Sequence, residues 1–328
     1  MAGTRRGDRR GGGETSTIRL IAVAVILIGL VLVSLRLLPG SPFESSAAAR
    51  WGDAGTNTNT NTNTSTSDRP TGAGTDRSAR QPSSTSPSPS PSLEPLPFVA
   101  KDLDLNIEGW YAWSVLDRRT GKIIGSKNMD ETSTTASMIK SWIVADYLRR
   151  AADAGQTPSD AKLADATRII RDSDNTRAEQ FYNLVGRDAS IKRLISMCKL
   201  TDSSVAPDGG WSRTALSPRD TARMGNCIAT GTAAGPTWTK WLLNEMKLVR
   251  GAGDFGIRKA FPAAEQKNIA IKNGWIDRTK EQEMHINCLA IGDTWTMGVM
   301  VKYPINMGYD YGMKNCQKIT EALLRPGT

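Results

Sequence analysis

A serine and a lysine near the start of a predicted helix could form an activated nucleophile. Ser137 and Lys140 stand three positions apart in the stretch TTASMIKSWIVADYLRR (134–150), so they share one face of a helix. A serine hydroxyl is a weak nucleophile until a base removes its proton, and lysine is such a base only when its amine is neutral. Burial or a second cation lowers the pKa of a lysine, and N–H groups at a helix start can stabilise an oxyanion. The pair predicts acyl transfer by a serine, against the simpler interpretation of an ordinary helix start.

Two further short motifs follow in the chain. Ser-Asp-Asn occupies positions 173–175, beginning 36 residues after Ser137, and Lys-Asn-Gly occupies 272–274, beginning a further 99 residues on. Taken alone, the first is typical of a helix cap, because Ser and Asp favour that position. The second, taken alone, is typical of a turn. Their order behind the Ser-Lys pair is what points to a site.

In this order the motifs resemble the set that marks class A β-lactamases and penicillin-binding proteins, which is Ser-x-x-Lys, Ser-Asp-Asn and Lys-Thr-Gly. The resemblance covers about residues 105–326. It implies a penicillin-recognising serine hydrolase that forms an acyl-enzyme without a cofactor or metal. The implied substrate is a β-lactam or a peptidoglycan stem.

The resemblance also implies a role for each motif residue. Ser137 would be the acylated nucleophile, and Lys140 would be its base or part of the proton relay. Ser173 would pass a proton to the leaving nitrogen. Asn175 would hold the amide side chain of the substrate and contact Lys140, while Lys272 would bind the carboxylate region of the substrate and tune the other groups.

The third motif departs from the family pattern. Asn273 stands where the family has a threonine hydroxyl that helps to hold the substrate carboxylate. The Asn273 amide can donate a hydrogen bond too, but with a different reach. We therefore expect Asn273, Gly274 and Trp275 to bind substrate, with the backbone N–H groups of Ser137 and Trp275 as the oxyanion hole, and the choice of substrate stays open.

A larger departure concerns release of the acyl group. Class A β-lactamases use a Glu after Ser-Asp-Asn to activate the hydrolytic water, but no Glu occurs here between Glu179 and Glu245. The expected stretch offers Asp202, Asp208 and Asp220. Counting back from the family-like segment ALSPRDTARM favours Asp202, and counting forward from Ser-Asp-Asn favours Asp208. Both stay candidates for the deacylation carboxylate, and slow deacylation is expected.

The elements around these motifs predict an α+β fold. A helical block between two groups of strands favours one five-stranded antiparallel sheet, flanked by helices and joined to a helical lobe, as in β-lactamases and D-Ala-D-Ala peptidases. A cleft is expected between sheet and helices. The predicted elements are a hairpin at 109–128 with a turn at 120–121, a helix at 137–152, a mostly helical block at 158–248, three strands at 261–276, 284–291 and 294–304, and a helix at 311–324.

The first 97 residues predict an anchor and a tether. Residues 1–17 form a basic tail, and residues 18–38 are apolar over a length that spans a bilayer. The Arg-rich tail favours a cytoplasmic N-terminus, hence a single-pass membrane protein with its catalytic domain, residues 98–328, outside the cytoplasm. A cleaved signal peptide is the alternative. Residues 39–97 are rich in Thr, Asn, Ser and Pro and read as a disordered linker.

All four cysteines and the single histidine fall in the predicted domain. An even number of cysteines in an exported domain favours disulfides, and local pairing gives Cys198–Cys227 and Cys288–Cys316. Four buried thiols are the alternative. His285 lies in a strand-like run and is interpreted as a strand residue, with a Ser/His pair as a weaker alternative.

The net charge of +9 in 328 residues does not indicate a nucleic-acid partner, because no Lys/Arg run with interleaved aromatic residues occurs in the predicted domain. The expected partners are a small-molecule substrate and the membrane, and a monomer is expected. Three functions remain open: a slowly deacylating serine hydrolase, a D-Ala-D-Ala carboxypeptidase or transpeptidase, and a non-catalytic envelope binding protein of the same fold.

Overall fold

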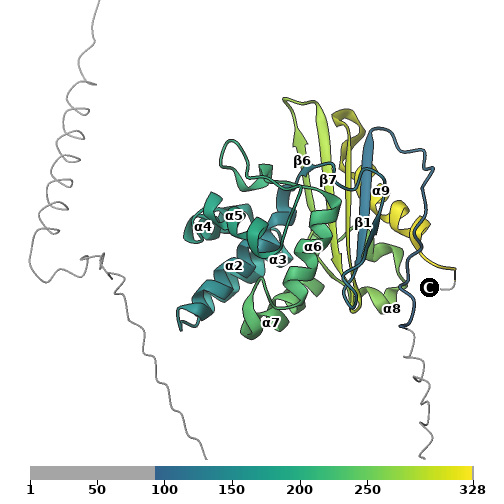
Figure 1. Cartoon of the computed structure of the whole chain (residues 1–328). Coiled ribbons are helices and arrows are strands. Elements are labelled where there is room, and N and C mark those ends of the chain that lie inside the picture. Colours follow the sequence, from purple (N-terminus) through teal and green to yellow (C-terminus); the bar gives the residue numbers. More distant parts are fainter. Residues whose placement is uncertain (1–92, 327–328) are drawn as a thin grey trace, which may run out of the picture. The chain divides into compact units, whose positions relative to one another are not determined.

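The computed structural model describes residues 93–326 (Figure 1). The predicted tail (1–17), the predicted anchor (18–38) and most of the predicted linker (39–97) lie outside the described residues. Between residues 93 and 326, no helix has the length and apolar character needed to cross a bilayer.

One antiparallel sheet carries the strands from both ends of the domain. Its order is β2-β1-β8-β7, and β5 and β6 both pair with the remaining edge of β7. The first two strands thus join the last ones, which confirms the predicted α+β fold. The strands are β1 (Trp110–Asp117), β2 (Ile123–Gly125), β5 (Ala270–Ile271), β6 (Gly274–Arg278), β7 (Glu283–Ile291) and β8 (Trp295–Pro304), and a separate ribbon joins β3 (Ser133–Thr134) to β4 (Ala215–Leu216).

The strand predicted at 261–276 is wrong in its first part. Residues 263–266 form the short helix α8, and β5 and β6 are two pieces separated by residues 272–273. The segment Ala-Ala-Glu-Gln consists of good helix formers, and Pro262 precedes it as the N-cap residue. The helix propensity of these residues therefore outweighs the apolar pattern that predicted a strand there.

Helices fill the chain between β3 and β5 and follow β8, as predicted. The α-helices are α2 (Lys140–Asp153), α3 (Asp160–Arg171), α4 (Asn175–Leu184), α5 (Asp188–Met197), α6 (Pro218–Ala229), α7 (Gly235–Lys247), α8 (Ala263–Gln266) and α9 (Gly308–Leu323). The 3-10 helices are η1 (Ala136–Ile139), η2 (Trp211–Arg213), η3 (Gly251–Gly253), η4 (Ile257–Ala260) and η5 (Ile305–Met307).

The sheet lies between α6 and α9 (Figure 1). Cys288 and Leu289 are neighbours on β7, so they point to opposite faces of the sheet. Cys288 is bonded to Cys316 of α9, whereas a Cβ added to Gly225 of α6 would lie 2.9 Å from the Leu289 side chain. The glycine allows α6 to approach the sheet closely on the face opposite α9.

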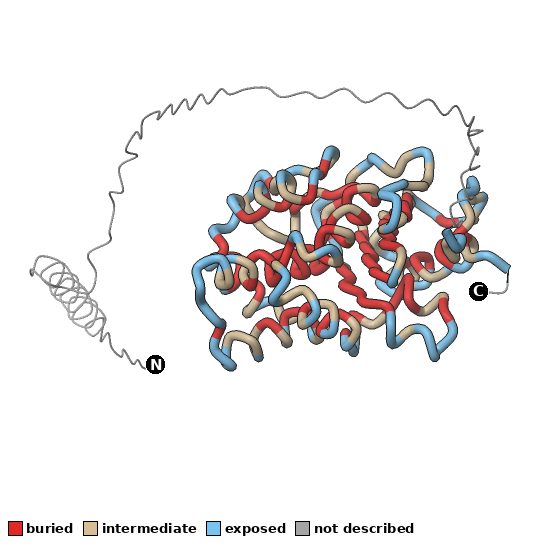
Figure 2. The backbone as a smooth tube through the Cα atoms, turned by 60° about the horizontal axis from the view of Figure 1, so that its bottom comes forward, coloured by how far each residue is buried: buried red, intermediate tan, exposed pale blue. Residues whose placement is uncertain are grey.

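Helix α2 is the buried centre of the helical lobe and packs against α3, α4 and α7. The Trp142 indole is fully buried and donates to the Ser190 carbonyl and hydroxyl, 3.0 Å from each. Asp146, also fully buried, accepts hydrogen bonds from Ser190 and Arg193. Figure 2 shows the buried segments running through the interior while exposed ones follow the outer loops. A fixed α2 gives Lys140, its first residue, a rigid position.

Two disulfides staple the domain, and both match the predicted local pairing. Cys198 follows α5 and is bonded to Cys227 of α6. Cys288 of β7 is bonded to Cys316 of α9. The alternative of four buried thiols is therefore wrong.

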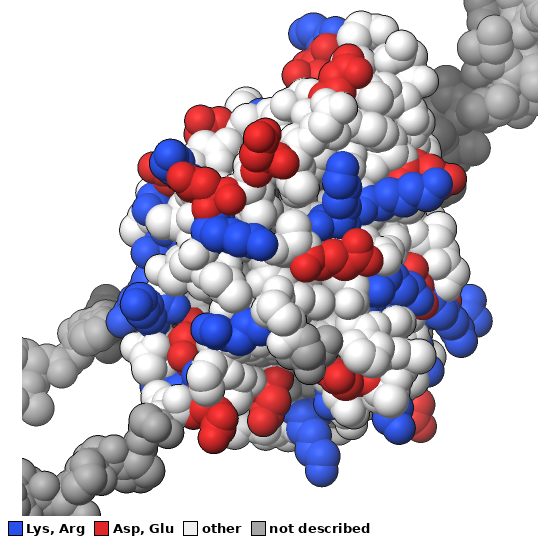
Figure 3. Space-filling model, turned by 90° about the vertical axis from the view of Figure 1, so that its right-hand side faces the viewer, with Lys and Arg blue, Asp and Glu red and all other residues white. Residues whose placement is uncertain are grey.

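The charged surface is mixed. On the face drawn in Figure 3, Lys and Arg side chains alternate with Asp and Glu side chains, and neither sign forms a continuous patch. This face has the character of an ordinary solvated surface.

Candidate active site

Ser137 stands on η1, which leads directly into α2. The Thr135 N–H, just before η1, donates to the Thr214 carbonyl at 2.9 Å, next to the β3–β4 ribbon. Ala136 has φ of 47°, in the left-handed region that residues with a Cβ rarely adopt. Such backbone strain gathers at functional sites. The fold thus holds Ser137, with only 9% of its surface exposed, at the tip of a strained turn.

Gly274 lets β6 approach the start of η1 very closely. A Cβ at this position would lie 2.9 Å from the Ser137 backbone nitrogen and 2.7 Å from that of Met138, and it would collide with the Thr135 carbonyl oxygen. These neighbours are backbone atoms, so no side-chain movement can make room. The glycine of Lys-Asn-Gly is therefore required by the close approach, and it places Trp275 next to the nucleophile turn.

Lys140 is fully buried and reaches across to the Ser-Asp-Asn segment. Its Nζ donates to the Ser173 carbonyl at 2.6 Å, to Asn175 Oδ1 at 2.6 Å and to Ser173 Oγ at 3.3 Å. Within residues 93–326, the Ser137 hydroxyl has no hydrogen-bond partner. Catalytic hydrogen bonds often tighten only when substrate is bound, so this arrangement is compatible with Lys140 serving Ser137.

Ser173 lies between two amines. Its Oγ accepts from Lys140 and also from Lys272, whose Nζ is 3.0 Å away. Ser173 has φ of 60°, and the next residue, Asp174, is the N-cap of α4, accepting from the Arg177 N–H at 2.8 Å. The motif is therefore a helix cap as well as a meeting point of charged groups.

Both lysines are held with lowered pKa values. Burial lowers the pKa of Lys140 to about 7, although the nearby Asp174 carboxylate acts in the opposite direction. Burial also lowers the pKa of Lys272 well below its ordinary value, and the charge of Lys140 lowers it further. The sequence led us to expect that Lys272 would depress the pKa of Lys140. In the structure, burial is the main cause of the lowered pKa of Lys140.

A groove opens in front of Ser137, with a volume of about 630 Å³. Trp211 and Trp275 contribute aromatic surface to it, Ile276 is aliphatic, and the remaining side chains are small or polar. The lining residues are Ala136, Ser137, Asn175, Thr176, Glu179, Gln180, Asn183, Trp211, Ser212, Trp275 and Ile276. The predicted residues Ser137, Asn175 and Trp275 thus share one cavity.

Two groove residues were not predicted from the sequence. The Trp211 ring lies over Lys140, with its centroid 4.9 Å from Nζ. Its Nε1–H donates to Glu179 Oε2 at 2.9 Å. Glu179 follows Asn175 by four positions on α4, a spacing that could have placed it on the same helix face. Nothing in the local sequence indicates that Trp211 reaches Lys140.

Asn273 turns away from the position predicted for substrate contact. Both N–H groups of its amide are donated to backbone carbonyls, to Gly253 at 3.0 Å and to Phe255 at 2.8 Å. The side chain is 1% exposed and is absent from the groove lining. In this arrangement Asn273 anchors the 253–255 segment, and its donors are not available to a substrate.

The three aspartates of the expected deacylation stretch do not line the groove. Asp202 accepts from Ser217 and forms an ion pair with Arg219 at 2.7 Å. The exposed Asp208 pairs with Arg213 at 3.3 Å. These commitments leave neither candidate positioned to activate a water at Ser137 in this structure.

Asp220, the third aspartate, is fully buried and supports the loop before α6. It accepts from the N–H groups of Thr201 and Asp202 and from the Ser203 hydroxyl. These hydrogen bonds give Asp220 a structural role in holding this loop.

His285 lies on β7, as the strand interpretation predicted. Its Nδ1 is 3.1 Å from the Ser133 hydroxyl and 2.8 Å from that of Thr134, and its Nε2 is 3.0 Å from Glu283. Burial lowers its pKa. The serine that contacts His285 is Ser133, which is buried and does not line the groove, rather than Ser137.

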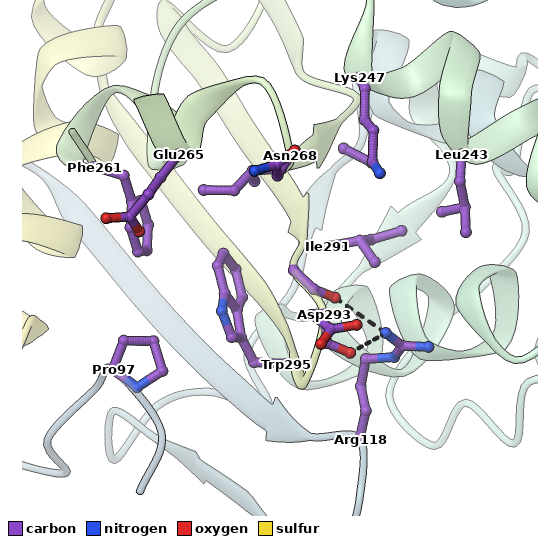
Figure 4. A pocket seen from close by; sticks show the side chains of 13 residues that line it. Pro97, Arg118, Leu243, Lys247, Phe261, Glu265, Asn268, Ile291, Asp293 and Trp295 are labelled. Carbon is purple, nitrogen blue, oxygen red and sulfur yellow. Dashed lines mark hydrogen bonds between the residues drawn. The ribbon is translucent and has the colours of Figure 1, made fainter. Parts of the chain in front are cut away.

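A second cavity, of about 500 Å³, lies where β7 turns into β8 (Figure 4). Its arginine, Arg118, donates to the carbonyl oxygens of Gly292 and Asp293 and so braces the turn. No serine, threonine or cysteine lines it, so it offers no hydroxyl or thiol nucleophile. Among residues 93–326, no three His, Cys, Asp or Glu side chains gather to hold a metal ion. The groove at Ser137 is the candidate active site.

The fold is that of solved class A β-lactamases. TLA-3 extended-spectrum β-lactamase aligns over 67% of this chain and 95% of its own with a TM-score of 0.56 and 13% identity. A class A β-lactamase from Bacteroides cellulosilyticus DSM 14838 aligns over 66% and 92% with a TM-score of 0.54 and 14% identity. One from Mycobacterium abscessus aligns over 66% and 93% with a TM-score of 0.51 and 17% identity. At such identities the likeness establishes the fold.

The sequence is also similar to mycobacterial proteins named "Putative lipoprotein LppW". Those of Mycobacterium tuberculosis (strain ATCC 25618 / H37Rv) and Mycobacterium bovis (strain ATCC BAA-935 / AF2122/97) are each 25% identical over 185 residues. The match covers 55% of this chain and 58% of the length of these relatives. No protein-family model matches the chain.

Proposed function

We propose that the domain at residues 98–328 is a serine hydrolase of the β-lactamase type, acylated at Ser137 and slow to release the acyl group. The observation that carries this proposal is the convergence of the buried Lys140 and Lys272 on Ser173, behind a groove that Ser137 and Asn175 line. Acyl transfer needs an activated hydroxyl, a proton donor for the leaving group and fixed donors for the oxyanion. This site can supply each of them.

Acylation begins when neutral Lys140 removes the Ser137 proton. The Ser137 oxygen then bonds to the carbonyl carbon of a β-lactam or related amide, and the carbonyl electrons move to its oxygen. The backbone N–H groups of Ser137 and Trp275 are assigned to that oxyanion, since Gly274 brings β6 against the nucleophile turn. A pKa of about 7 leaves much of Lys140 neutral at physiological pH.

The tetrahedral intermediate collapses by breaking the carbon–nitrogen bond. Ser173 donates its hydroxyl proton to the departing nitrogen and is reprotonated by Lys140, which holds the proton taken from Ser137. The hydrogen bond between Lys140 Nζ and Ser173 Oγ, at 3.3 Å, supports this relay. The products are an ester on Ser137 and a neutral amine that carries the proton lost by Ser137.

Slow deacylation follows from the placement of the carboxylates. The ester needs an activated water, and a class A enzyme provides a glutamate for it. Here Asp202 and Asp208 are ion-paired outside the groove lining. The one carboxylate in the lining, Glu179, has both oxygens engaged, by Trp211 and Arg187.

The same geometry also serves the alternative of a D-Ala-D-Ala carboxypeptidase or transpeptidase, since those enzymes form the same ester. A non-catalytic binding protein would have no use for two lysines with lowered pKa values at one serine. We further propose that residues 18–38 anchor the chain and that residues 39–97 tether the domain outside the cytoplasm. The lipoprotein name of the LppW relatives supports membrane association.

The test is intact-mass spectrometry of the full chain with a penicillin over time. We expect one persistent adduct, and none on Ser137→Ala. Ser212→Ala is the matched control, because Ser212 lines the same groove but is not assigned to the reaction. An adduct on Ser137→Ala would contradict the nucleophile, and rapid turnover would contradict slow release.

A further inference from the structure

Trp211 covers the amine that the proposed reaction uses as its base. The ring lies 4.9 Å from Lys140 Nζ, and it belongs to η2, 71 positions further along the chain than Lys140. Lys140 is fully buried, and both Trp211, whose ring lies over its amine, and Asn175, which accepts from it, line the groove. The indole therefore lies over this amine and also lines the groove.

A set of contacts holds the indole in place. The Trp211 N–H donates to Glu179 Oε2 at 2.9 Å, and Arg187 Nη1 donates to Glu179 Oε1 at 2.7 Å. Arg187 Nη2 also donates to the Gly209 carbonyl at 2.9 Å, two residues before Trp211. Helix α4 and the segment before η2 are thereby joined at both the ring and the backbone.

Resting on the proposed function, we propose that Trp211 is a positioning residue for acylation, which keeps water away from Lys140, and that Glu179 holds the indole over the amine. Glu179 acts through Trp211, and Trp211 acts through Lys140. Neither residue is assigned a chemical step.

The ring has two opposing effects on the pKa of Lys140, and their balance decides whether removing the ring raises or lowers that pKa. An aromatic face attracts an ammonium ion, which favours the charged form of Lys140. Water solvates an ammonium more strongly than a ring does, so excluding water favours the neutral form. Burial is the first cause of the lowered pKa of Lys140. Removing the ring should therefore raise that pKa.

Other charged groups lie around this amine and the ring that covers it. Lys272 faces Lys140 from between β5 and β6, Asp174 faces it from the N-cap of α4, and Glu179 approaches from α4 itself. The variants at position 211 all keep these charged groups. A shift in the Lys140 pKa among those variants therefore reports the loss of the ring over the amine.

The experiment is a pH titration of the full chain labelled with [ε-13C]lysine, with the Lys140 signal assigned by its loss in Lys140→Met. The midpoint should lie near 7 in the unmodified protein. In Trp211→Ala it should rise by about one unit or more. Trp211→Phe, which keeps a ring, should shift the midpoint less. Trp238→Ala, on α7, is the matched control and should cause no shift.

Glu179 is tested by two variants. Glu179→Gln keeps a carbonyl oxygen that can accept the indole N–H, so the midpoint should stay close to that of the unmodified protein. Glu179→Ala removes the acceptor and should raise the midpoint, by less than Trp211→Ala does. If Trp211→Ala does not fold, Glu179→Ala decides. An unchanged Lys140 midpoint in the deciding variant overturns the proposal.

The titration also separates this proposal from the function on which it rests. Absence of any penicillin adduct on the unmodified protein would contradict the proposed function, yet the Lys140 midpoint would still be measured. If adducts form, the midpoint of their pH profile should move together with the Lys140 midpoint in each variant. An adduct profile that stays fixed while Lys140 shifts would contradict a role in acylation.

Discussion

Lys140 and Lys272 point their amines at the same hydroxyl, lying 3.3 Å and 3.0 Å from Ser173 Oγ. Two ammonium ions this close together repel each other strongly in a buried site. The pair therefore avoids carrying two charges, and burial of both side chains favours loss of a proton. A site that keeps amines neutral near pH 7 is suited to take a proton from a serine.

The rate of acylation should depend on pH through Lys140. Its pKa of about 7 means that the neutral base is half populated near pH 7. The rate of adduct formation should fall about tenfold for each unit below that, and level off above it. Adduct formation followed between pH 5.5 and 8.5 measures this. His285→Asn, which removes the only histidine of the chain, should leave the midpoint in place, and a flat profile would contradict Lys140 as the base.

Gly274→Ala should block the site. The added methyl group meets the backbone of Thr135, Ser137 and Met138, so η1 and β6 must separate. We expect a stability loss of about 1–3 kcal/mol, as for overpacked cores, with acylation slowed much more than the stability loss alone implies. Urea unfolding and adduct kinetics measure the two effects. Gly210→Ala is the control, because the three atoms nearest to its new methyl group all belong to the exposed Asp208 side chain. Normal acylation of Gly274→Ala would refute the close-approach argument.

Asp202→Ala should leave the lifetime of the acyl-enzyme unchanged within about a factor of three. Its carboxylate is committed to Ser217 and Arg219, and no groove-lining position is lost. Removal of the partly buried ion-pair partner should instead cost about 1–3 kcal/mol of stability. Adduct decay by mass spectrometry and urea unfolding separate the outcomes. A lifetime prolonged by tenfold or more would assign Asp202 to deacylation after all.

Removing the disulfide between Cys198 and Cys227, by changing both to Ala, should destabilise the helical lobe. The sulfurs close a loop with a sequence separation of 29, for which chain entropy predicts a loss of about 3–4 kcal/mol. Thermal unfolding with and without the substitutions measures it. Thermal unfolding under reducing conditions is the control. Reduction breaks the Cys198–Cys227 bond in the unmodified chain and should lower its melting temperature, whereas the variant has no such bond to lose.

The sequence by itself predicted the fold and the central residues of the candidate site. The strands of β7 and β8, the helix beginning near Ser137 and both disulfide pairs follow from periodicity, turn signals and local pairing. These features depend on residues close together in the chain. Ser137, Lys140 and Ser173 were found because each lies in a short motif whose spacing has a physical reason.

Only the tertiary structure decided what surrounds that core. Trp211 reaches Lys140 across 71 positions, and Asn273 gives its donors to carbonyls about 20 positions earlier in the chain. Whether Asp202 is free to activate a water depends on its partners, Ser217 and Arg219, and only the folded structure shows them. A side chain's direction depends on which distant groups compete for its hydrogen bonds, and no local pattern encodes that competition. Burial of Lys140 is likewise a property of the packed groups around it, so its readiness to act as a base appears only in the folded chain.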